Sequence, residues 1–414
     1  MINNNLRSSN SFLTIDLTNK RSIFILIGLC FIFYYPIIYG SGLYADDVYR
    51  INVSNDGFGW HRLGRPLAKS IAQLYSADMR LIIDASPLSW LLSISLIASS
   101  TILIYSKLNS KYKTYALPLA LVFIINPFFI ENLLYRFDNL GMFLGLFLVV
   151  LSFSIQNHSK WNITIKIITL VLSMNFYQTF SNIFLSLVAV EAALMAYNND
   201  KTKNIIKYLI VSFLIFILAN IFYYLELKIL GTPRRGELIP LSISSISIIF
   251  NNYYRAFQHF INFWSYFKYF IYPIIPFIVF SFFIISRSWK KTFITLLSLI
   301  VILFSTIGLM ALLKNPPFFP RSLHFFSPLL MLATALIIAG RTYFKWVMLL
   351  PLFACLIFSY RVGNMQKLQR EFETPIAYNL YLHIAENKHI KKYYSIGRLP
   401  SSNYIKNIIK YTPY

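Results

Sequence analysis

The sequence is poor in cysteine, and its two cysteines, Cys30 and Cys355, both lie inside apolar segments. Two isolated thiols supply neither a disulfide framework nor a CxxC metal or redox motif. The cysteines therefore predict neither a structural zinc site nor a disulfide-stapled fold.

Charge is also scarce, and most of it has one sign. Only 13% of the 414 residues are charged, with 38 Lys and Arg against 15 Asp and Glu, a formal net charge of +23. A nucleic-acid binder gathers its basic residues on a soluble face or stripe, whereas here they punctuate apolar runs. We therefore expect no nucleic-acid partner.

Apolar side chains are abundant and make up 57% of the chain. A spanning helix needs about 20 mostly apolar residues, and such runs recur, which predicts an all-α polytopic membrane protein. We expect eleven spans, near residues 22–40, 88–106, 114–130, 139–155, 162–176, 179–197, 207–228, 268–286, 292–313, 323–340 and 344–360. The fifth and sixth spans are the weakest, and their junction could be a re-entrant bend. We interpret the first run as an uncleaved anchor rather than a signal peptide.

The short loops give an orientation, because cytoplasmic loops retain Lys and Arg. Alternate loops carry the lysines on the side of Lys20 and Arg21, so the segment 1–21 is expected in the cytoplasm. With an odd number of spans, the transmembrane domain 22–360 leaves the tail 361–414 in the periplasm. The tail's nine Lys and Arg do not favour that side, but the rule largely ignores longer domains. Twelve of the fifteen carboxylates lie in or beside outer segments, so carboxylate chemistry would be periplasmic.

Three outer segments are long: residues 41–87, residues 229–267, and the tail, which we expect to form a small domain. Residues 66–77 place apolar side chains on one helical face, which predicts a helix on the membrane surface. A second surface helix is expected over residues 243–263.

The first outer loop opens with an acidic motif, Tyr44-Ala45-Asp46-Asp47-Val48-Tyr49-Arg50, directly after the first span. Adjacent carboxylates repel, so one can hold a raised pKa or both can bind a divalent cation such as Mg²⁺ or Mn²⁺. Either state suits a base that accepts a hydroxyl proton, and a solvated acidic turn is the plain structural alternative. Asp46 and Asp47 are the candidate catalytic residues, with Tyr44, Arg50 and Trp60 as candidate substrate ligands.

Outer arginines form the second candidate group, because a guanidinium at headgroup height can hold a phosphate through two hydrogen bonds. The plain alternative is interfacial anchoring. Arg136 is crowded with Glu131 and Asp138 in one tight turn, which favours a site lining. The candidate phosphate ligands are Arg65, Arg136, Arg234, Arg235 and Arg321, and further candidate substrate ligands are Glu131, Asp138 and His324.

A polar cluster interrupts the weak hairpin at Asn175, Tyr177, Gln178 and Asn182. Such groups can hold helices together, and they can equally bind sugar hydroxyls. The structural role is favoured for the cluster, while Tyr177 and Gln178 are kept as candidate substrate ligands.

The acidic motif, then Gly64-Arg65-Pro66-Leu67, then Phe176-Tyr177-Gln178, follow an order that resembles the GtrII-type family of bacterial glucosyltransferases that modify O-antigen. The resemblance continues to the tail, where Asn364-Met365-Gln366-Lys367 begins a similar closing segment. It implies a GT-C-like fold, a polyprenyl-phosphate-linked glucose donor and an O-antigen (lipopolysaccharide) repeat unit as acceptor. It further implies a periplasmic site in the bacterial inner membrane, serotype conversion as the outcome, and a donor-lipid flippase and a donor-lipid synthase as functional partners.

The residues and the resemblance together give a mechanistic hypothesis. Asp46 or Asp47 deprotonates an acceptor hydroxyl, the oxygen attacks the anomeric carbon, and the polyprenyl phosphate leaves with inversion. Arginines stabilise the charge that develops on the phosphate, with Arg65 and Arg136 ranked first. A divalent cation stays unresolved, because two carboxylates alone do not specify one.

Three alternatives remain open. A GT-C relative could use another sugar or a protein acceptor. A lipid or polysaccharide transporter would need charges near the midplane and discontinuous spans in related halves, whereas most charge here lies at the outer rim. A polysaccharide polymerase would also be external and arginine-dependent, but the paired aspartates after the first span favour the transferase.

Overall fold

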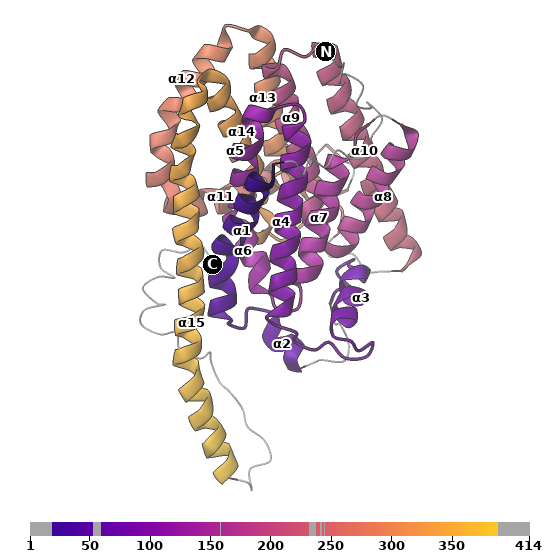
Figure 1. Cartoon of the computed structure of the whole chain (residues 1–414). Coiled ribbons are helices and arrows are strands. Elements are labelled where there is room, and N and C mark those ends of the chain that lie inside the picture. The colour runs from indigo at the N-terminus through magenta and orange to yellow at the C-terminus, as the bar shows by residue number, and fades with distance from the viewer. Residues whose placement is uncertain are drawn as a thin grey trace.

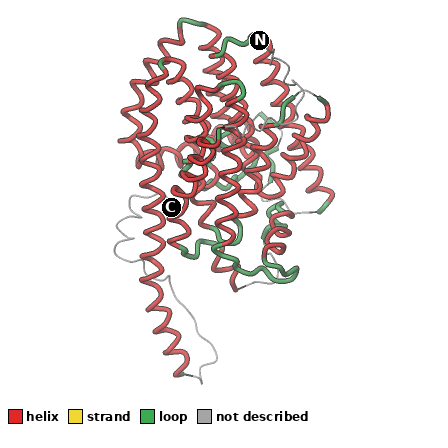
Figure 2. The backbone as a smooth tube through the Cα atoms, viewed as in Figure 1, coloured by secondary structure: helices red, strands yellow, loops and turns green. Residues whose placement is uncertain are grey.

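The computed structural model describes residues 19–52, 59–157, 159–231, 237–240, 242–243 and 245–387. Within them all regular secondary structure is helical (Figure 2), with an isolated antiparallel bridge between Leu238 and Leu313. The all-α class predicted from the sequence is therefore confirmed for the described chain. Most of the predicted cytoplasmic segment and the end of the predicted tail lie outside the described residues.

Six helices of the described chain are long and apolar enough to cross a membrane. They are Lys20–Gly40 (α1), Leu88–Asn109 (α4), Lys160–Tyr197 (α8, Lys160–Tyr177, with α9, Ser181–Tyr197), Thr202–Ile229 (α10), Phe267–Ser286 (the end of α11, Ser245–Ile271, with α12, Ile275–Ser286) and Thr342–Glu386, which includes α15 (Leu349–Glu386). The bundle also contains the shorter helices α5 (Lys113–Ile124), α6 (Pro127–Leu134), α7 (Asn139–Ser154), α13 (Trp289–Phe304) and α14 (Phe326–Gly340). A seventh candidate span exists if α5 and α6, bent by 43°, count as one. These are the helices of a polytopic membrane protein, and the number of eleven spans stays a prediction.

The two ends of the bundle differ in their charged residues. We call the end with Asp46 and Asp47, at the bottom of Figure 1 beside α2 (Asp47–Asn52) and α3 (Pro66–Tyr75), the acidic end. The opposite, basic end holds Lys107 near the end of α4, whose ammonium lies 3.0 Å from a carboxylate oxygen of Glu191. The sequence predicts that the acidic end faces the periplasm.

The helices α8 and α9 form a hairpin whose tip points toward the acidic end. Lys166 of α8 and Glu191 of α9 both lie within electrostatic range of Lys107, so α8 leaves the basic end and α9 returns to it. At the tip Tyr177 has an extended backbone, with φ −158° and ψ 102°, which interrupts the helix before the turn Gln178–Phe180. The chain therefore turns at this junction, and the turn carries the polar cluster of the sequence to the acidic end; whether the hairpin spans the membrane or is re-entrant stays open.

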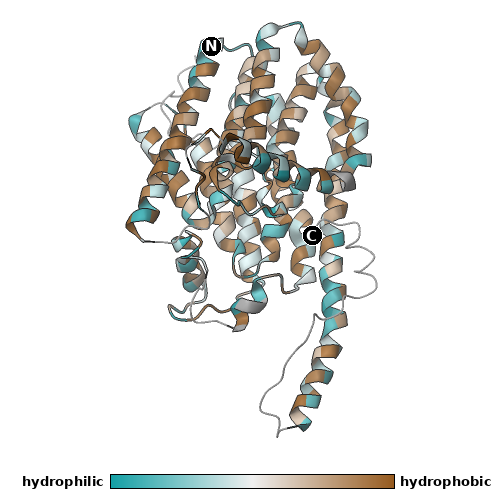
Figure 3. Cartoon of the chain, turned by 180° about the vertical axis from the view of Figure 1, so that it is seen from behind, coloured by the Kyte–Doolittle hydropathy of each residue, from teal (hydrophilic) through white to brown (hydrophobic). Residues whose placement is uncertain are grey.

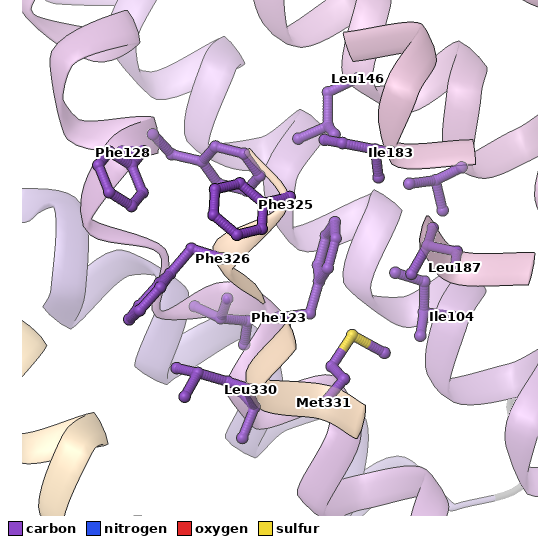
Figure 4. Packing of buried hydrophobic residues seen from close by; sticks show 14 of the residues in the cluster. Ile104, Phe123, Phe128, Leu146, Ile183, Leu187, Phe325, Phe326, Leu330 and Met331 are labelled. Carbon is purple, nitrogen blue, oxygen red and sulfur yellow. The ribbon is translucent and has the colours of Figure 1, made fainter. Parts of the chain in front are cut away.

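The core between the helices is built from large apolar side chains, many of them aromatic. Ile104, Phe123, Leu146, Ile183 and Met331 come from five different helices and are all buried (Figure 4). Edge-to-face ring pairs of the kind seen throughout this core add to the free energy gained by burial. The core thus holds the helices that carry the site in fixed positions.

The first and last of the long helices pack closely through a glycine. A Cβ built on Gly363 of α15 would clash with the backbone carbonyl of Pro36 on α1. Small residues allow such close backbone approach between membrane helices. Beyond this contact α15 runs past the acidic end (Figure 1), where its surface is more hydrophilic (Figure 3). The apolar run of the sequence ends at residue 360, but the helix continues to Glu386.

Both segments that the sequence predicts as surface helices are helical, while their position on the membrane surface stays a prediction. α3 begins at Pro66 and packs Ala68 and Ala72 against Trp60 and Phe137, while Leu74 remains 70% exposed. α11 is amphipathic and crosses the back of the bundle (Figure 3). It extends past the predicted end at residue 263 to Ile271.

Candidate active site

A cavity of about 400 Å³ lies at the acidic end, beside the tip of the α8–α9 hairpin. Its walls come from the loop before α3, from α10, and from the segment between α13 and α14. Most of the lining is apolar, including Ile217, Ile221, Leu227, Leu309, Leu312 and Leu313. Ile221 is 48% exposed, so the α10 wall of the cavity reaches the outer surface of the bundle. The volume is in the range of small-molecule sites.

Arg65 brings a buried guanidinium to this cavity. Its Nε donates a 2.8 Å hydrogen bond to Oε1 of Gln178, and its guanidinium carbon lies 4.4 Å from the centre of the Tyr177 ring. A guanidinium over an aromatic face is stabilised by the ring quadrupole. The structure therefore brings together three residues that the sequence proposed separately: Arg65, Tyr177 and Gln178.

Gln178 and Tyr223 hold the loop that carries Arg65. Nε2 of Gln178 donates to the Leu63 carbonyl at 2.6 Å and to the Tyr223 hydroxyl at 2.8 Å, and that hydroxyl donates to the Gly64 carbonyl at 2.7 Å. Gly64 has φ +73°, and a Cβ there would lie 2.8 Å from the Tyr223 oxygen. Glycine is thus required both by the left-handed backbone and by the close approach of α10.

Arg321 is the second cation of the cavity and is bound to Glu131. Its Nη1 donates to Oε1 of Glu131 at 2.8 Å and its backbone N–H donates to Oε2 at 2.6 Å, while the Tyr44 hydroxyl donates to Oε1 at 3.2 Å. Burial disfavours the charged guanidinium, but Tyr177 and Glu131 outweigh it and raise the pKa of Arg321 above its ordinary value. The cation therefore stays charged although it is largely buried.

The two adjacent aspartates have opposite environments. Asp47 is fully buried, and its carboxylate accepts hydrogen bonds of 3.1 Å from the backbone N–H groups of Arg136 and Tyr44. Burial raises the pKa of Asp47 to about 7. Asp46 is exposed, and it lies within electrostatic range of the hydroxyl groups of Tyr44 and Tyr135. A raised pKa for one of the two was predicted, but its main cause is burial rather than repulsion between neighbours.

Three candidate substrate ligands instead bind one another. Nε and Nη2 of Arg50 donate to the two oxygens of Asp138 at 2.9 and 3.0 Å, and the Trp60 indole N–H also donates to Asp138. Arg50 lies 3.9 Å from the centre of the Trp60 ring. All three side chains are buried and none lines the cavity. They tie the first loop to the turn between α6 and α7.

Arg136 lies behind the acidic motif and is not among the residues that line the cavity. Its Nη1 donates to Asp84 at 2.7 Å, and its guanidinium also donates to the carbonyls of Ser41 and Gly42. Burial of Asp84 opposes its ionisation, but hydrogen bonds from Ser86 and Arg136 outweigh it and lower the pKa of Asp84.

The other predicted site residues are placed as follows. His324 is buried beneath the site, where its Nε2 lies 3.2 Å from the Asn132 amide oxygen and its ring packs on Phe180. Arg234 and Arg235 lie outside the described residues. Within the described part of the chain, no three His, Cys, Asp or Glu side chains gather in a group that could hold a metal ion.

Sequence reasoning missed Tyr223 and gave no role to Phe319, whose ring lies 4.1 Å from the Arg321 guanidinium carbon. Tyr223 lies within the apolar run of α10, where nothing marks it apart from its neighbours Tyr224 and Phe222. Only its place near the outer end of that predicted span could have drawn attention to it.

The helices and the cavity define a polytopic membrane protein with a mainly apolar cavity, lined by two arginines, near its acidic end. Within that class the chain belongs to the GtrII glucosyl transferase family, whose sequence profile matches residues 35–339. The resemblance identified from the motifs is thus confirmed.

A curated relative with clear similarity comes from Salmonella phage P22. Over 164 residues the chain is 33% identical to the uncharacterized 55.3 kDa protein in the gtrB 5' region of that phage. The matched stretch is 39% of this chain and 33% of the phage protein, so the chain spans about a third of that relative's length. No solved structure matches the chain.

Proposed function

We propose that the protein transfers glucose from a polyprenyl-phosphate-linked donor to an O-antigen repeat unit at the periplasmic face of the bacterial inner membrane. The observation that carries the proposal is a mainly apolar cavity that is lined by both Arg65 and Arg321, each of which contacts Tyr177. A lipid-linked sugar phosphate needs this combination, because its tail is apolar and its phosphate is anionic.

In this proposal the donor enters along α10, past Ile221, and its phosphate lies between the two guanidiniums. Arginine presents a rigid fork of donors that suits phosphate oxygens. When the bond between the anomeric carbon and the phosphate oxygen breaks, negative charge develops on the leaving phosphate, and fixed donors in a site with little water stabilise that charge strongly. Arg321 takes the place that the sequence gave to Arg136, because Arg136 is engaged by Asp84 and backbone carbonyls outside the cavity.

We assign the role of general base to Asp46, because its carboxylate is exposed at the acidic end and can meet an acceptor from the aqueous side. The acceptor hydroxyl gives its proton to Asp46, and its oxygen forms the new bond to the anomeric carbon as the polyprenyl phosphate leaves. One displacement of this kind inverts the anomeric centre. Asp47 holds the turn that presents Asp46, through its hydrogen bonds to Tyr44 and Arg136.

The proposal includes the partners that the family resemblance implies, and it considers the divalent cation that the paired aspartates raised. A donor-lipid synthase and a flippase would supply the donor on the periplasmic side. A divalent cation such as Mg²⁺ or Mn²⁺ would have to use Asp46 with groups of the substrate, because Asp47 is enclosed by protein. No step of the mechanism depends on it.

The test is expression of the wild type, Asp46→Asn and Asp47→Asn with the cognate synthase and flippase in a host of known O-antigen. We expect a new hexose branch on the polysaccharide with the wild type and its loss with Asp46→Asn at normal protein level. An unchanged polysaccharide with wild-type protein would overturn the proposal in favour of transport or another acceptor. A change in chain length without a branch would favour a polymerase.

A further inference from the structure

The polar cluster of the α8–α9 hairpin consists of Asn175, Tyr177, Gln178 and Asn182. One of the four has a side chain without a hydrogen-bond partner among the described residues. Nδ2 of Asn175 donates to Oε2 of Glu226 at 2.7 Å, and Gln178 holds Arg65 and Tyr223. The side-chain amide of Asn182, by contrast, makes no hydrogen bond within the described chain. The structural role that the sequence favoured for this cluster therefore accounts for Asn175 and Gln178 but not for Asn182.

Asn182 lines the cavity and is only 7% exposed. The backbone of Gly308 lies directly against its amide, in a left-handed conformation with φ +50°, and a Cβ at that position would clash with the amide oxygen. The neighbouring Thr179 hydroxyl is also buried and lacks a partner among the described residues. Buried amides and hydroxyls of native proteins are nearly always hydrogen-bonded, so two such groups in one cavity wall indicate a ligand.

The chemistry of the amide restricts the kind of group that it binds. Asn182 is neutral and offers both a donor and an acceptor. A hydroxyl can use both of these groups, whereas a phosphate oxygen can use only the donor. It follows Gln178, the partner of Arg65, by four residues across the turn Gln178–Phe180 into α9, a rise of about 6 Å at about 1.5 Å per residue. A hydroxyl-bearing ring joined directly to a phosphate fits such a spacing.

We propose that Asn182 binds a hydroxyl of the hexosyl group of the donor and so helps to select the sugar that is transferred. This inference rests on the proposed function, and it assigns the sugar to the inner wall of the cavity, with the phosphate at Arg65 and Arg321. Thr179 lies beside the same ring. Gly308 is the residue that leaves room for the amide.

The test uses purified full-length protein and a polyprenyl-phosphate glucose donor, together with the set of its monodeoxy analogues. Asn182→Leu keeps the approximate side-chain size and removes both hydrogen-bonding groups. We expect kcat/KM for the glucose donor to fall about tenfold or more. With the one analogue that lacks the contacted hydroxyl, wild type and variant should have the same kcat/KM.

Asn220→Leu is the matched control, because Asn220 lines the same cavity but its amide already donates to the Phe216 carbonyl at 2.8 Å. It should change kcat/KM by one common factor for every donor. An Asn182→Leu loss that is equal for all donors would overturn the sugar subsite. If that variant does not accumulate, Asn182→Ala gives the same comparison, because alanine also lacks both hydrogen-bonding groups. Absence of transfer by the wild type from any of these donors would instead defeat the proposed function itself.

Discussion

Replacement of Asp47 by asparagine should remove a pH dependence of stability that arises from burial of this carboxyl. Burial raises its pKa from 3.8 to about 7, so the folded state holds a proton that the unfolded state loses near pH 4. The contribution of this carboxyl to the free energy of unfolding is therefore greatest at low pH. It falls as the pH rises from about 4 to about 7 and does not change above pH 7. Three pKa units at about 1.4 kcal/mol each make the total loss about 4 kcal/mol.

The assay is unfolding by denaturant in detergent micelles between pH 4.5 and 8.5, followed by the fluorescence of the six tryptophans. The amide that replaces the carboxyl cannot titrate, so the free energy of unfolding of the wild type, relative to Asp47→Asn, should fall by about 1.4 kcal/mol per pH unit up to pH 7. Asp46→Asn is the control, because Asp46 is exposed and its removal should leave the wild-type slope unchanged. Parallel pH curves for wild type and Asp47→Asn would refute the argument from burial.

Three further predictions concern the groups around the cavity. Arg65→Lys should lower glucosyl transfer about 10- to 100-fold while the protein level stays normal, because lysine loses the planar fork and its stacking on the aromatic ring; equal transfer would argue against a phosphate at this position. Gly64→Ala should reduce transfer because its Cβ would lie 2.8 Å from the Tyr223 oxygen, and addition of Tyr223→Phe should restore part of it; a double variant no better than the single one would contradict this. Asp138→Asn should destabilise the protein by about 3–5 kcal/mol in the same denaturant assay, because the buried Arg50 loses its ionic partner; a loss under about 1 kcal/mol would show that the pair is not a structural support.

The positions of the helices could be predicted because hydropathy is a local property of the chain. The predicted span 207–228 lies within Thr202–Ile229, and the span 22–40 matches Lys20–Gly40 closely. Less local features were not predicted. The span 114–130 is broken where Oδ1 of Asn126 accepts from the Phe128 backbone N–H at 3.0 Å, which starts a new helix at Pro127. An asparagine followed by a proline is a signal for a helix start that hydropathy alone does not register.

The sequence indicates which types of residue form the candidate site. It does not indicate which arginine pairs with which carboxylate. Arg136 and Arg321 look alike in the sequence, since each lies in a short outer turn. Their partners are 52 and 190 residues away in the chain, Asp84 for the first and Glu131 for the second. Only the folded structure decides which of two such arginines borders a cavity and which is enclosed by protein. The same holds for Arg50 and its distant partner Asp138.

The paired aspartates show that the fold can give different environments even to two adjacent residues of the same type. In sequence Asp46 and Asp47 are equivalent, and a metal site or a shared proton would need both at one place. Asp47 is the first residue of α2 and its carboxyl is buried, whereas Asp46 lies in the turn before the helix and stays exposed. The buried residue accepts backbone hydrogen bonds that fix the turn, and the exposed one is free to meet an acceptor. A mechanism with one base, held in place by a second carboxyl that never contacts substrate, therefore agrees with this geometry better than one in which the two act together.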